Sequence, residues 1–118
     1  EVTITSLDEQ FLSAALKAVE GNVSNPDFSV EDLSSALNMH RSHLYRKILG
    51  ITGKTPIEFI RLIRLKRSKQ YLAQSQMYIA EIAYHVGFNS PKLFAKYFKD
   101  EFGLTPREYK AQFSDNIN

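Results

Sequence analysis

The sequence contains no cysteine among its 118 residues, and this absence excludes both a disulfide framework and a thiolate metal site. No apolar run approaches the roughly 20 residues that a helix needs to cross a bilayer, and no signal peptide is visible. We therefore expect a soluble, cytoplasmic domain that makes no membrane contact. The chain begins at Glu1 rather than at a methionine, so we expect it to be part of a longer polypeptide, which can itself be membrane-anchored.

Patterns typical of catalysis and metal binding are also missing. No nucleophile, base and orienting residue occur together in a recognisable arrangement, and no glycine-rich phosphate loop is present. His40 and His43 are three residues apart, but no third ligand follows at a spacing suited to a metal. The sequence thus predicts a protein that is not an enzyme and that needs neither a metal nor another cofactor.

Charge is unevenly distributed along the chain, although the net charge is only +2. Residues 1–37 contain seven acidic residues and one basic residue, whereas residues 38–118 contain fourteen basic and six acidic residues. A basic region of this kind is the electrostatic footprint of a phosphate-binding surface, although a solvated surface can have the same composition. Composition alone therefore leaves both interpretations open.

The spacing of apolar residues predicts an all-α fold of seven helices, and no β pattern survives. Cap and turn signals mark the helix ends. Ser6 with Glu9 forms the pattern of a capping box at the first helix, and Asn38 suits the left-handed turn that ends the second. The predicted helices cover residues 6–20, 29–38, 40–49, 56–74, 79–86, 91–102 and 106–113.

An internal repeat relates the two halves of the chain. Seven pairs of similar residues lie 50 positions apart and two earlier pairs lie 49 apart, so the turn of the second copy is one residue longer. The pairs are Leu44 with Phe94, Ile48 with Phe98, Gly53 with Gly103, Thr55 with Thr105, Pro56 with Pro106, Glu58 with Glu108, Phe59 with Tyr109, Leu33 with Ile82 and Leu37 with Val86. A duplicated helix-turn-helix explains this pattern most simply.

The second helix of each copy has two different faces. Leu44 and Ile48 lie one turn apart and are expected inside, as are Phe94 and Phe98 in the second copy. The opposite faces carry Arg41, Ser42, Tyr45 and Arg46 in the first copy, and Lys92, Ala95 and Lys96 in the second. Two such helices in one small domain suggest a reader of nucleic acid.

The fourth predicted helix is the longest of the seven. Ile57, Ile60 and Leu72 are expected to give it apolar contact surface on more than one side. Its middle, residues 61–69, is strongly basic. Such a helix is expected to contact both copies of the repeat.

Two stretches of the sequence resemble a known family. Residues 59–72, FIRLIRLKRSKQYL, precede residues 79–109, IAEIAYHVGFNSPKLFAKYFKDEFGLTPREY. With the I-A-x-x-V-G-F turn and the G-x-T-P-x-E-Y ending, residues 28–109 resemble the DNA-binding domain of AraC-type transcription regulators. A narrower resemblance is to the output domain of Bacteroides-type hybrid two-component regulators. This resemblance is carried by the extra N-terminal helix and by the segments TSLDEQFL and YRKILGITGKTPIEFIRLIRLKR.

The resemblance implies two helix-turn-helix subdomains joined by a long linker helix. An accessory segment with an additional N-terminal helix would cover residues 1–27, and the DNA-binding domain residues 28–113. Within the latter we expect a first unit at 28–55, the linker helix at 56–74 and a second unit at 79–113. The linker helix would span roughly 27 Å and one duplex turn is about 34 Å, so two recognition helices can enter successive major grooves of double-stranded DNA.

The resemblance also implies which residues contact DNA. The base-facing positions of the family fall on Arg41, Ser42, Tyr45 and Arg46 in the first unit and on Pro91, Lys92, Ala95 and Lys96 in the second. From the basic linker helix, we expect contacts with DNA phosphates from Arg61, Arg64 and Arg67. The sequence departs from the family pattern at His40, where a capping serine is usual, at Ser68, where alanine is usual, and at Pro91, which removes a backbone N–H.

Each of these assignments has a simpler alternative. Arg46 and Lys96 can be ordinary solvated residues, Tyr45 can cover the core, and long helices commonly carry surface charge. A second hypothesis for the function is a protein-interaction module that contacts RNA polymerase or a second protomer, as in a homodimer, through the acidic helix at residues 6–20. We favour sequence-specific binding of double-stranded DNA and transcription regulation, because the basic residues cluster on the second helices and the linker.

Overall fold

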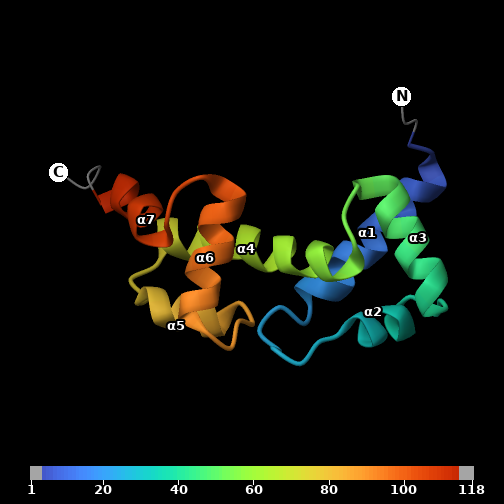
Figure 1. The fold of residues 1–118 in the computed structure, drawn as a ribbon, viewed down its shortest axis with the longest axis horizontal. Coiled ribbons are helices and arrows are strands. Elements are labelled where there is room, and N and C mark those ends of the chain that lie inside the picture. The colour runs from blue at the N-terminus through green and yellow to red at the C-terminus, as the bar shows by residue number, and fades with distance from the viewer. Residues whose placement is uncertain (1–3, 115–118) are drawn as a thin grey trace. The chain divides into compact units, whose positions relative to one another are not determined.

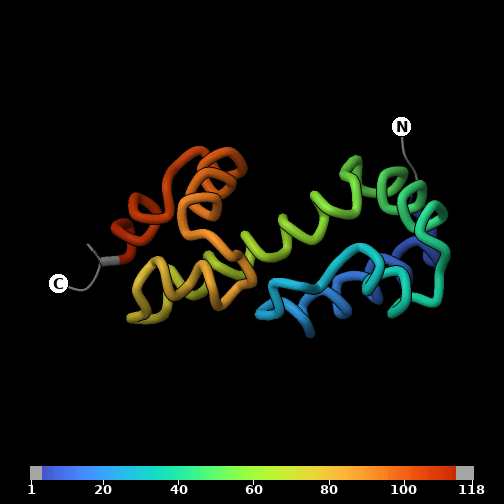
Figure 2. Tube along the Cα trace, turned by 60° about the horizontal axis from the view of Figure 1, so that its bottom comes forward, coloured from blue at the N-terminus to red at the C-terminus, as the bar shows by residue number. Residues whose placement is uncertain are grey.

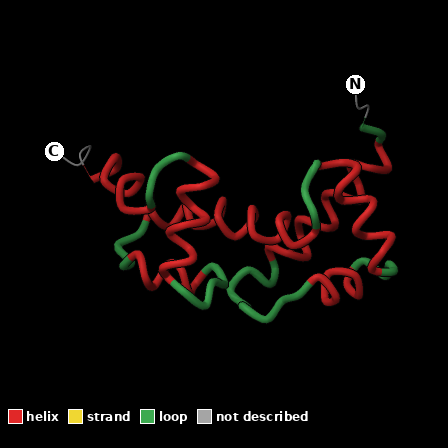
Figure 3. The backbone as a smooth tube through the Cα atoms, in the orientation of Figure 1, coloured by secondary structure: helices red, strands yellow, loops and turns green. Residues whose placement is uncertain are grey.

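The structure, a computed structural model, describes residues 4–114. Within that range the chain forms seven α-helices and no strand (Figures 1 and 3). The helices are α1 (Ser6–Glu20), α2 (Val30–Ala36), α3 (Arg41–Thr52), α4 (Pro56–Gln74), α5 (Ile79–His85), α6 (Pro91–Phe102) and α7 (Pro106–Ser114). The predicted all-α class with seven helices is confirmed. No helix within these residues is long and apolar enough to cross a membrane.

The helices belong to two compact units. The described part of the first unit covers residues 4–23 and 27–63, and that of the second covers residues 24–26 and 64–114. In the first unit α2 contacts α1 and α3, and in the second α6 contacts α5 and α7. The trace in Figure 2 can be followed through each set of helices in turn. The boundary between the units falls inside α4, between Ile63 and Arg64.

Side-chain caps explain where the first two helices begin. The backbone N–H of Asp8 donates to Thr5 Oγ1 at 3.1 Å, and the N–H of Thr5 donates to Asp8 Oδ2 at 3.3 Å. The capping box of α1 is therefore one residue earlier than the predicted pair of Ser6 and Glu9, because Thr5 has the extended backbone that a cap requires and Ser6 is already helical. Ser29 and Asp32 form the equivalent box at α2.

The two copies of the repeat begin their last helix with the same pair of hydrogen bonds. The N–H of Thr55 donates to Glu58 Oε1 at 2.8 Å, and the N–H of Glu58 donates to Thr55 Oγ1 at 3.3 Å. Thr105 and Glu108 repeat these bonds at 2.8 and 3.1 Å. The bond from the threonine backbone holds the pKa of each glutamate below its usual value. Pro56 and Pro106 occupy the first helical position, where a missing N–H costs little.

Both helix-turn-helix turns use a residue in the left-handed conformation. Asn38 has a φ of 52° in the first turn, as predicted, and Gly87 has a φ of 94° in the second. The next residue then donates its N–H back to the preceding helix, from Met39 to the carbonyl of Ser34 and from Phe88 to the carbonyl of Ala83, at 2.9 Å each. These bonds fix the angle at which the second helix of each pair leaves the turn.

The predicted apolar seams of α3 and α6 lie in the cores of the two units. Leu44, Ile48, Phe94 and Phe98 have no exposed surface. In the first unit the core consists of Ala15, Val19, Phe28, Leu33, Leu44, Ile48, Phe59, Ile60 and Ile63. Ile57 does not belong to this core, because 63% of its surface is exposed. The prediction of Ile57 as an apolar contact of α4 is therefore wrong.

Candidate nucleic-acid interface

In the first unit α3 is the second helix of the helix-turn-helix. Arg41, Ser42, Tyr45 and Arg46 are all exposed on it, while Leu44 is fully buried on the opposite side. The buried seam anchors the helix, so the four exposed side chains are available to a ligand in solution. The structure thus brings together the four residues that the sequence predicts to face bases in this unit.

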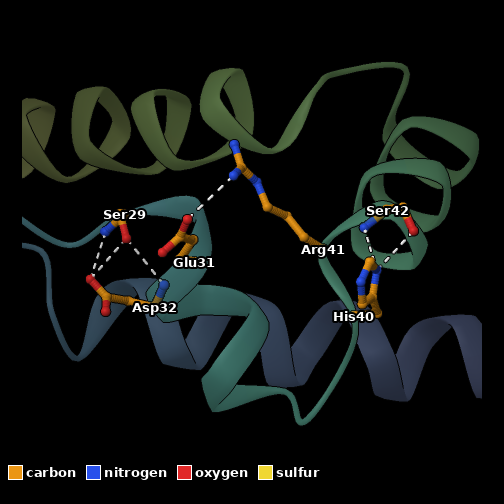
Figure 4. A network of polar contacts seen from close by, with 6 residues as sticks. All are labelled: Ser29, Glu31, Asp32, His40, Arg41 and Ser42. Atoms are coloured by element: carbon orange, nitrogen blue, oxygen red, sulfur yellow. Dashed lines mark hydrogen bonds and ion pairs between the residues drawn. The ribbon is translucent and has the colours of Figure 1, made fainter.

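An imidazole caps the start of α3. The backbone N–H of Ser42 donates to His40 Nδ1 at 3.2 Å, and Ser42 Oγ lies 2.9 Å from the same nitrogen (Figure 4). Because a backbone N–H can only donate, Nδ1 must carry no proton in this arrangement. The sequence pattern left open whether His40 could replace a capping serine. The structure shows that it does, and that it orients the hydroxyl of a predicted base-facing residue.

We expect His40→Ala to lower the free energy of unfolding by about 1 kcal/mol, because the N–H of Ser42 then loses its acceptor. His40→Ser keeps an acceptor at the same position and is expected to retain most of the stability. Urea unfolding followed by circular dichroism measures both variants against the parent chain. Equal stability of the alanine variant and the parent chain would show that the imidazole cap contributes nothing.

Arg41 is held by an acidic residue of the preceding helix. Its guanidinium Nη1 lies 3.3 Å from Glu31 Oε1, and both side chains are mostly exposed. Figure 4 shows Arg41 extending from the start of α3 toward Glu31 on α2. An exposed pair of this kind contributes little to stability, but it limits the directions in which Arg41 can point. The sequence did not predict that Glu31 pairs with Arg41, because an acidic residue in one helix does not indicate which basic residue it contacts.

An open groove of about 600 Å³ lies beside these residues in the first unit. Val30, Tyr45, Pro56 and Ile57 give it an apolar lining, and the polar residues His40, Arg41, Ser42 and Thr55 also line it. Three helices contribute to the groove, namely α2, α3 and the start of α4. The sequence pattern assigned Ile57 to helix packing and to no binding site.

In the second unit α6 is the helix that corresponds to α3 in the repeat. Lys92 and Lys96 are exposed on it, whereas Pro91 and Ala95 are half-buried. Ser90 caps the helix, accepting the N–H of Leu93 at 3.2 Å, so the helix start is capped although Pro91 offers no N–H. Lys96 Nζ forms an exposed ion pair with Asp100 at 3.1 Å. This face carries less hydrogen-bonding capacity than that of α3.

The three arginines predicted to contact phosphate have different environments. Arg61 and Arg67 are half-buried, whereas Arg64 is only 6% exposed. Arg64 donates from Nη1 to the carbonyl of Val86 at 3.1 Å and from Nη2 to the carbonyl of Asn25 at 3.0 Å, within the second unit. Burial lowers the pKa of this guanidinium. The structure therefore contradicts the prediction that Arg64 contacts DNA phosphate, because its donors already bind two backbone oxygens.

Ser68, in α4, is the second of the three departures named above and is fully buried. Its hydroxyl donates to the carbonyl of Leu65 at 2.6 Å, so the polar group at this packing position has a partner within its own helix. Among residues 4–114, no group of three or more acidic or histidine side chains is arranged to hold a metal ion.

Residues 33–112 match the sequence model of a family described as "Helix-turn-helix domain". Histidine kinase P4 of Formosa agariphila is 45% identical over 117 residues, which are 99% of this chain and 8% of that protein. The lactose operon transcription activator of Staphylococcus xylosus is 35% identical over 88 residues, which are 75% of this chain and 32% of that protein. The chain thus spans at most about a third of the length of these two relatives.

Solved structures share the arrangement of helices. A transcriptional regulator from Chromobacterium violaceum, one of the AraC-type DNA-binding domain-containing proteins, is similar with a TM-score of 0.85 and 27% identity, covering 95% of this chain and 99% of that chain. The DNA-binding domain of AdpA, solved in complex with a target DNA, has a TM-score of 0.77 and 24% identity, covering 93% of this chain and 95% of that chain. The second likeness shows the fold alone.

Proposed function

Since the chain belongs to the AraC-type helix-turn-helix family, whose members are DNA-binding domains of transcription regulators, we propose that α3 and α6 each lie in a major groove of double-stranded DNA. The family assignment makes the chain a DNA-binding domain in transcription regulation rather than an enzyme. The finer proposal concerns which residues read the bases and which protein the domain serves.

The observation that carries the proposal is the two-sided character of α3. Leu44 and Ile48 have no exposed surface, whereas Arg41, Tyr45 and Arg46 on the other side are exposed. A helix anchored in this way by a turn and a buried seam can enter a major groove, which is about 12 Å wide, without losing its packing. The repeat gives α6 the same support from Phe94 and Phe98.

Groove chemistry assigns roles to five of the eight base-facing residues. Arg46 can donate two hydrogen bonds to O6 and N7 of guanine, and Lys92 and Lys96 can donate to guanine or to phosphate. Tyr45 can offer its ring to a thymine methyl or its hydroxyl to phosphate, and the small side chain of Ala95 permits close approach. Arg61 and Arg67 remain the proposed phosphate contacts of α4. We therefore assign more of the sequence specificity to the first unit.

The domain is further proposed to be the output part of a larger signalling protein. The relative with 45% identity bears the name of a histidine kinase, and the matched residues are only 8% of its length. In such a protein the signal would reach this domain from another part of the chain. Contacts with RNA polymerase, or with a second protomer in a homodimer, stay predictions.

Selection of binding sites from a random double-stranded DNA pool tests the proposed function. We expect the parent chain to enrich one motif with a box for each recognition helix, and the affinity for that motif to fall steeply with salt because phosphate contacts release counterions. The variant Lys17→Ala, which removes a lysine of α1 outside both recognition helices, is the control and is expected to select the same motif. Failure to enrich any sequence over the starting pool would contradict the proposal.

A further inference from the structure

The groove beside α3 exposes apolar side chains where solvent would favour polar ones. Ile57 at the start of α4 is 63% exposed and Tyr45 on α3 is 46% exposed, and both line the groove together with Val30 and Pro56. Its volume of about 600 Å³ is open to solvent within the first unit. Clustered exposed apolar surface of this kind usually marks a binding site.

The internal repeat shows that the fold does not require this apolar surface. The residue 50 positions after Ile57 is Arg107, and the residue 50 positions after Tyr45 is Ala95. Arg107 is exposed at the equivalent position of the second copy, directly after Pro106 and before the capping residue Glu108. The second unit thus builds the same helices and the same capping box with arginine in place of isoleucine. Ile57 and Tyr45 are therefore not explained by packing alone.

The lining of the groove limits what can occupy it. Arg41, Ser42 and Tyr45 belong both to the groove and to the set of proposed base-facing residues. When α3 lies in a major groove of DNA, the edges of the base pairs are the groups that face this surface. The C5-methyl group of thymine is the apolar group among them, since the other base edges there present hydrogen-bond donors and acceptors.

We propose that this groove receives the methyl edge of a thymine, and that Ile57 on α4 is a sequence-reading residue of the first unit. The assignment rests on the proposed function, because it places α3 in the major groove. Ile57 and Tyr45 would remove the thymine methyl from water, while Arg46, which is not part of the lining, would contact a different base. The first unit then reads DNA with two helices, α3 and the first turn of α4.

Uracil substitution tests the proposal at the level of one methyl group. The motif selected by the parent chain is prepared with each thymine replaced in turn by deoxyuridine, which lacks only that methyl. At one thymine we expect the parent chain to lose affinity about fourfold, the value of one buried methyl-sized group. Ile57→Ala is expected to bind the thymine and uracil sites almost equally. Leu7→Ala on α1, with a similar exposure of 69% in the parent, is the control and should keep the fourfold difference.

The outcomes separate this proposal from the proposed function. The thymine contact is wrong if the parent chain binds a specific motif but no uracil substitution weakens that binding. It is also wrong if Ile57→Ala loses as much affinity on uracil substitution as the parent chain does. The groove would then serve another occupant, such as a small apolar ligand or a protein segment. If the parent chain selects no motif, the proposed function itself fails. Ile57→Arg, which copies Arg107 of the repeat, provides a second variant whose folding is supported by the second unit, and it is also expected to lose the methyl preference.

Discussion

Replacing Arg64 with alanine is expected to lower the free energy of unfolding by roughly 3 kcal/mol, because two backbone oxygens then lose their charged donor. The carbonyl of Val86 receives Nη1 at 3.1 Å and the carbonyl of Asn25 receives Nη2 at 3.0 Å. Val86 is itself fully buried and Arg64 is 6% exposed, so water cannot readily replace the lost bond to Val86. Urea unfolding of the parent and variant chains, followed by circular dichroism, measures the difference.

Two further variants define the reason for this loss. Arg64→Lys keeps the positive charge but not the forked donor geometry, and we expect it to recover only part of the stability. Arg67→Ala removes a half-buried arginine three residues later on the same helix and is expected to cost much less. If Arg64→Ala unfolded like the parent but bound all DNA sequences more weakly, Arg64 would be a phosphate contact after all.

Arg46→Ala is expected to weaken binding to the selected motif by about 1–3 kcal/mol and to relax the preference at one base. Arg46 is exposed on α3, where its guanidinium can form two parallel hydrogen bonds with guanine, and alanine can form neither. The effect on stability should be small because the side chain is exposed. Affinity measurements on the parent motif and repeated selection with the variant report the two parts of this result.

Lys47→Ala serves as the control for Arg46. Lys47 is the next residue on α3, but its ammonium lies 5.1 Å from the centre of the Phe11 ring, toward α1. We expect this variant to keep the base preference of the parent. If Arg46→Ala also selected an unchanged motif, Arg46 would be a solvated residue or a phosphate contact and not a base reader.

The parts of the fold that were predicted from the sequence depend on signals between close neighbours. Leu44 and Ile48 lie one turn apart, and both are fully buried as their spacing predicted. Asn38 adopts the left-handed turn that its side chain tolerates. At α1 two patterns compete, since Thr5 with Asp8 and Ser6 with Glu9 have the same spacing, and only the backbone conformation of Thr5 decides between them.

The residues that were wrongly predicted depend on contacts between distant parts of the chain. Arg64 stands in a basic run beside Arg61 and Arg67, and nothing in that run indicates that its guanidinium is buried against Asn25. Ile57 matched the apolar pattern of α4, but the exposure of its side chain depends on where the neighbouring helices end, which the pattern of α4 does not give. The groove is made by residues from three helices, so no local pattern could reveal it. The exposed face of α3, in contrast, followed from its own periodicity.

The bond between Arg64 and Asn25 has a consequence for the rates of folding and unfolding. It joins residues 39 positions apart, whereas the main contacts between helices join consecutive helices. Contacts between consecutive helices cost little loop-closure entropy and favour rapid folding, while a bond across a long loop is expected to form late. Removing a bond that is absent from the transition state accelerates unfolding and leaves the folding rate nearly unchanged. Arg64 would therefore set how long the second unit stays folded and not how quickly it forms, a distinction that stopped-flow measurements on Arg64→Ala would reveal.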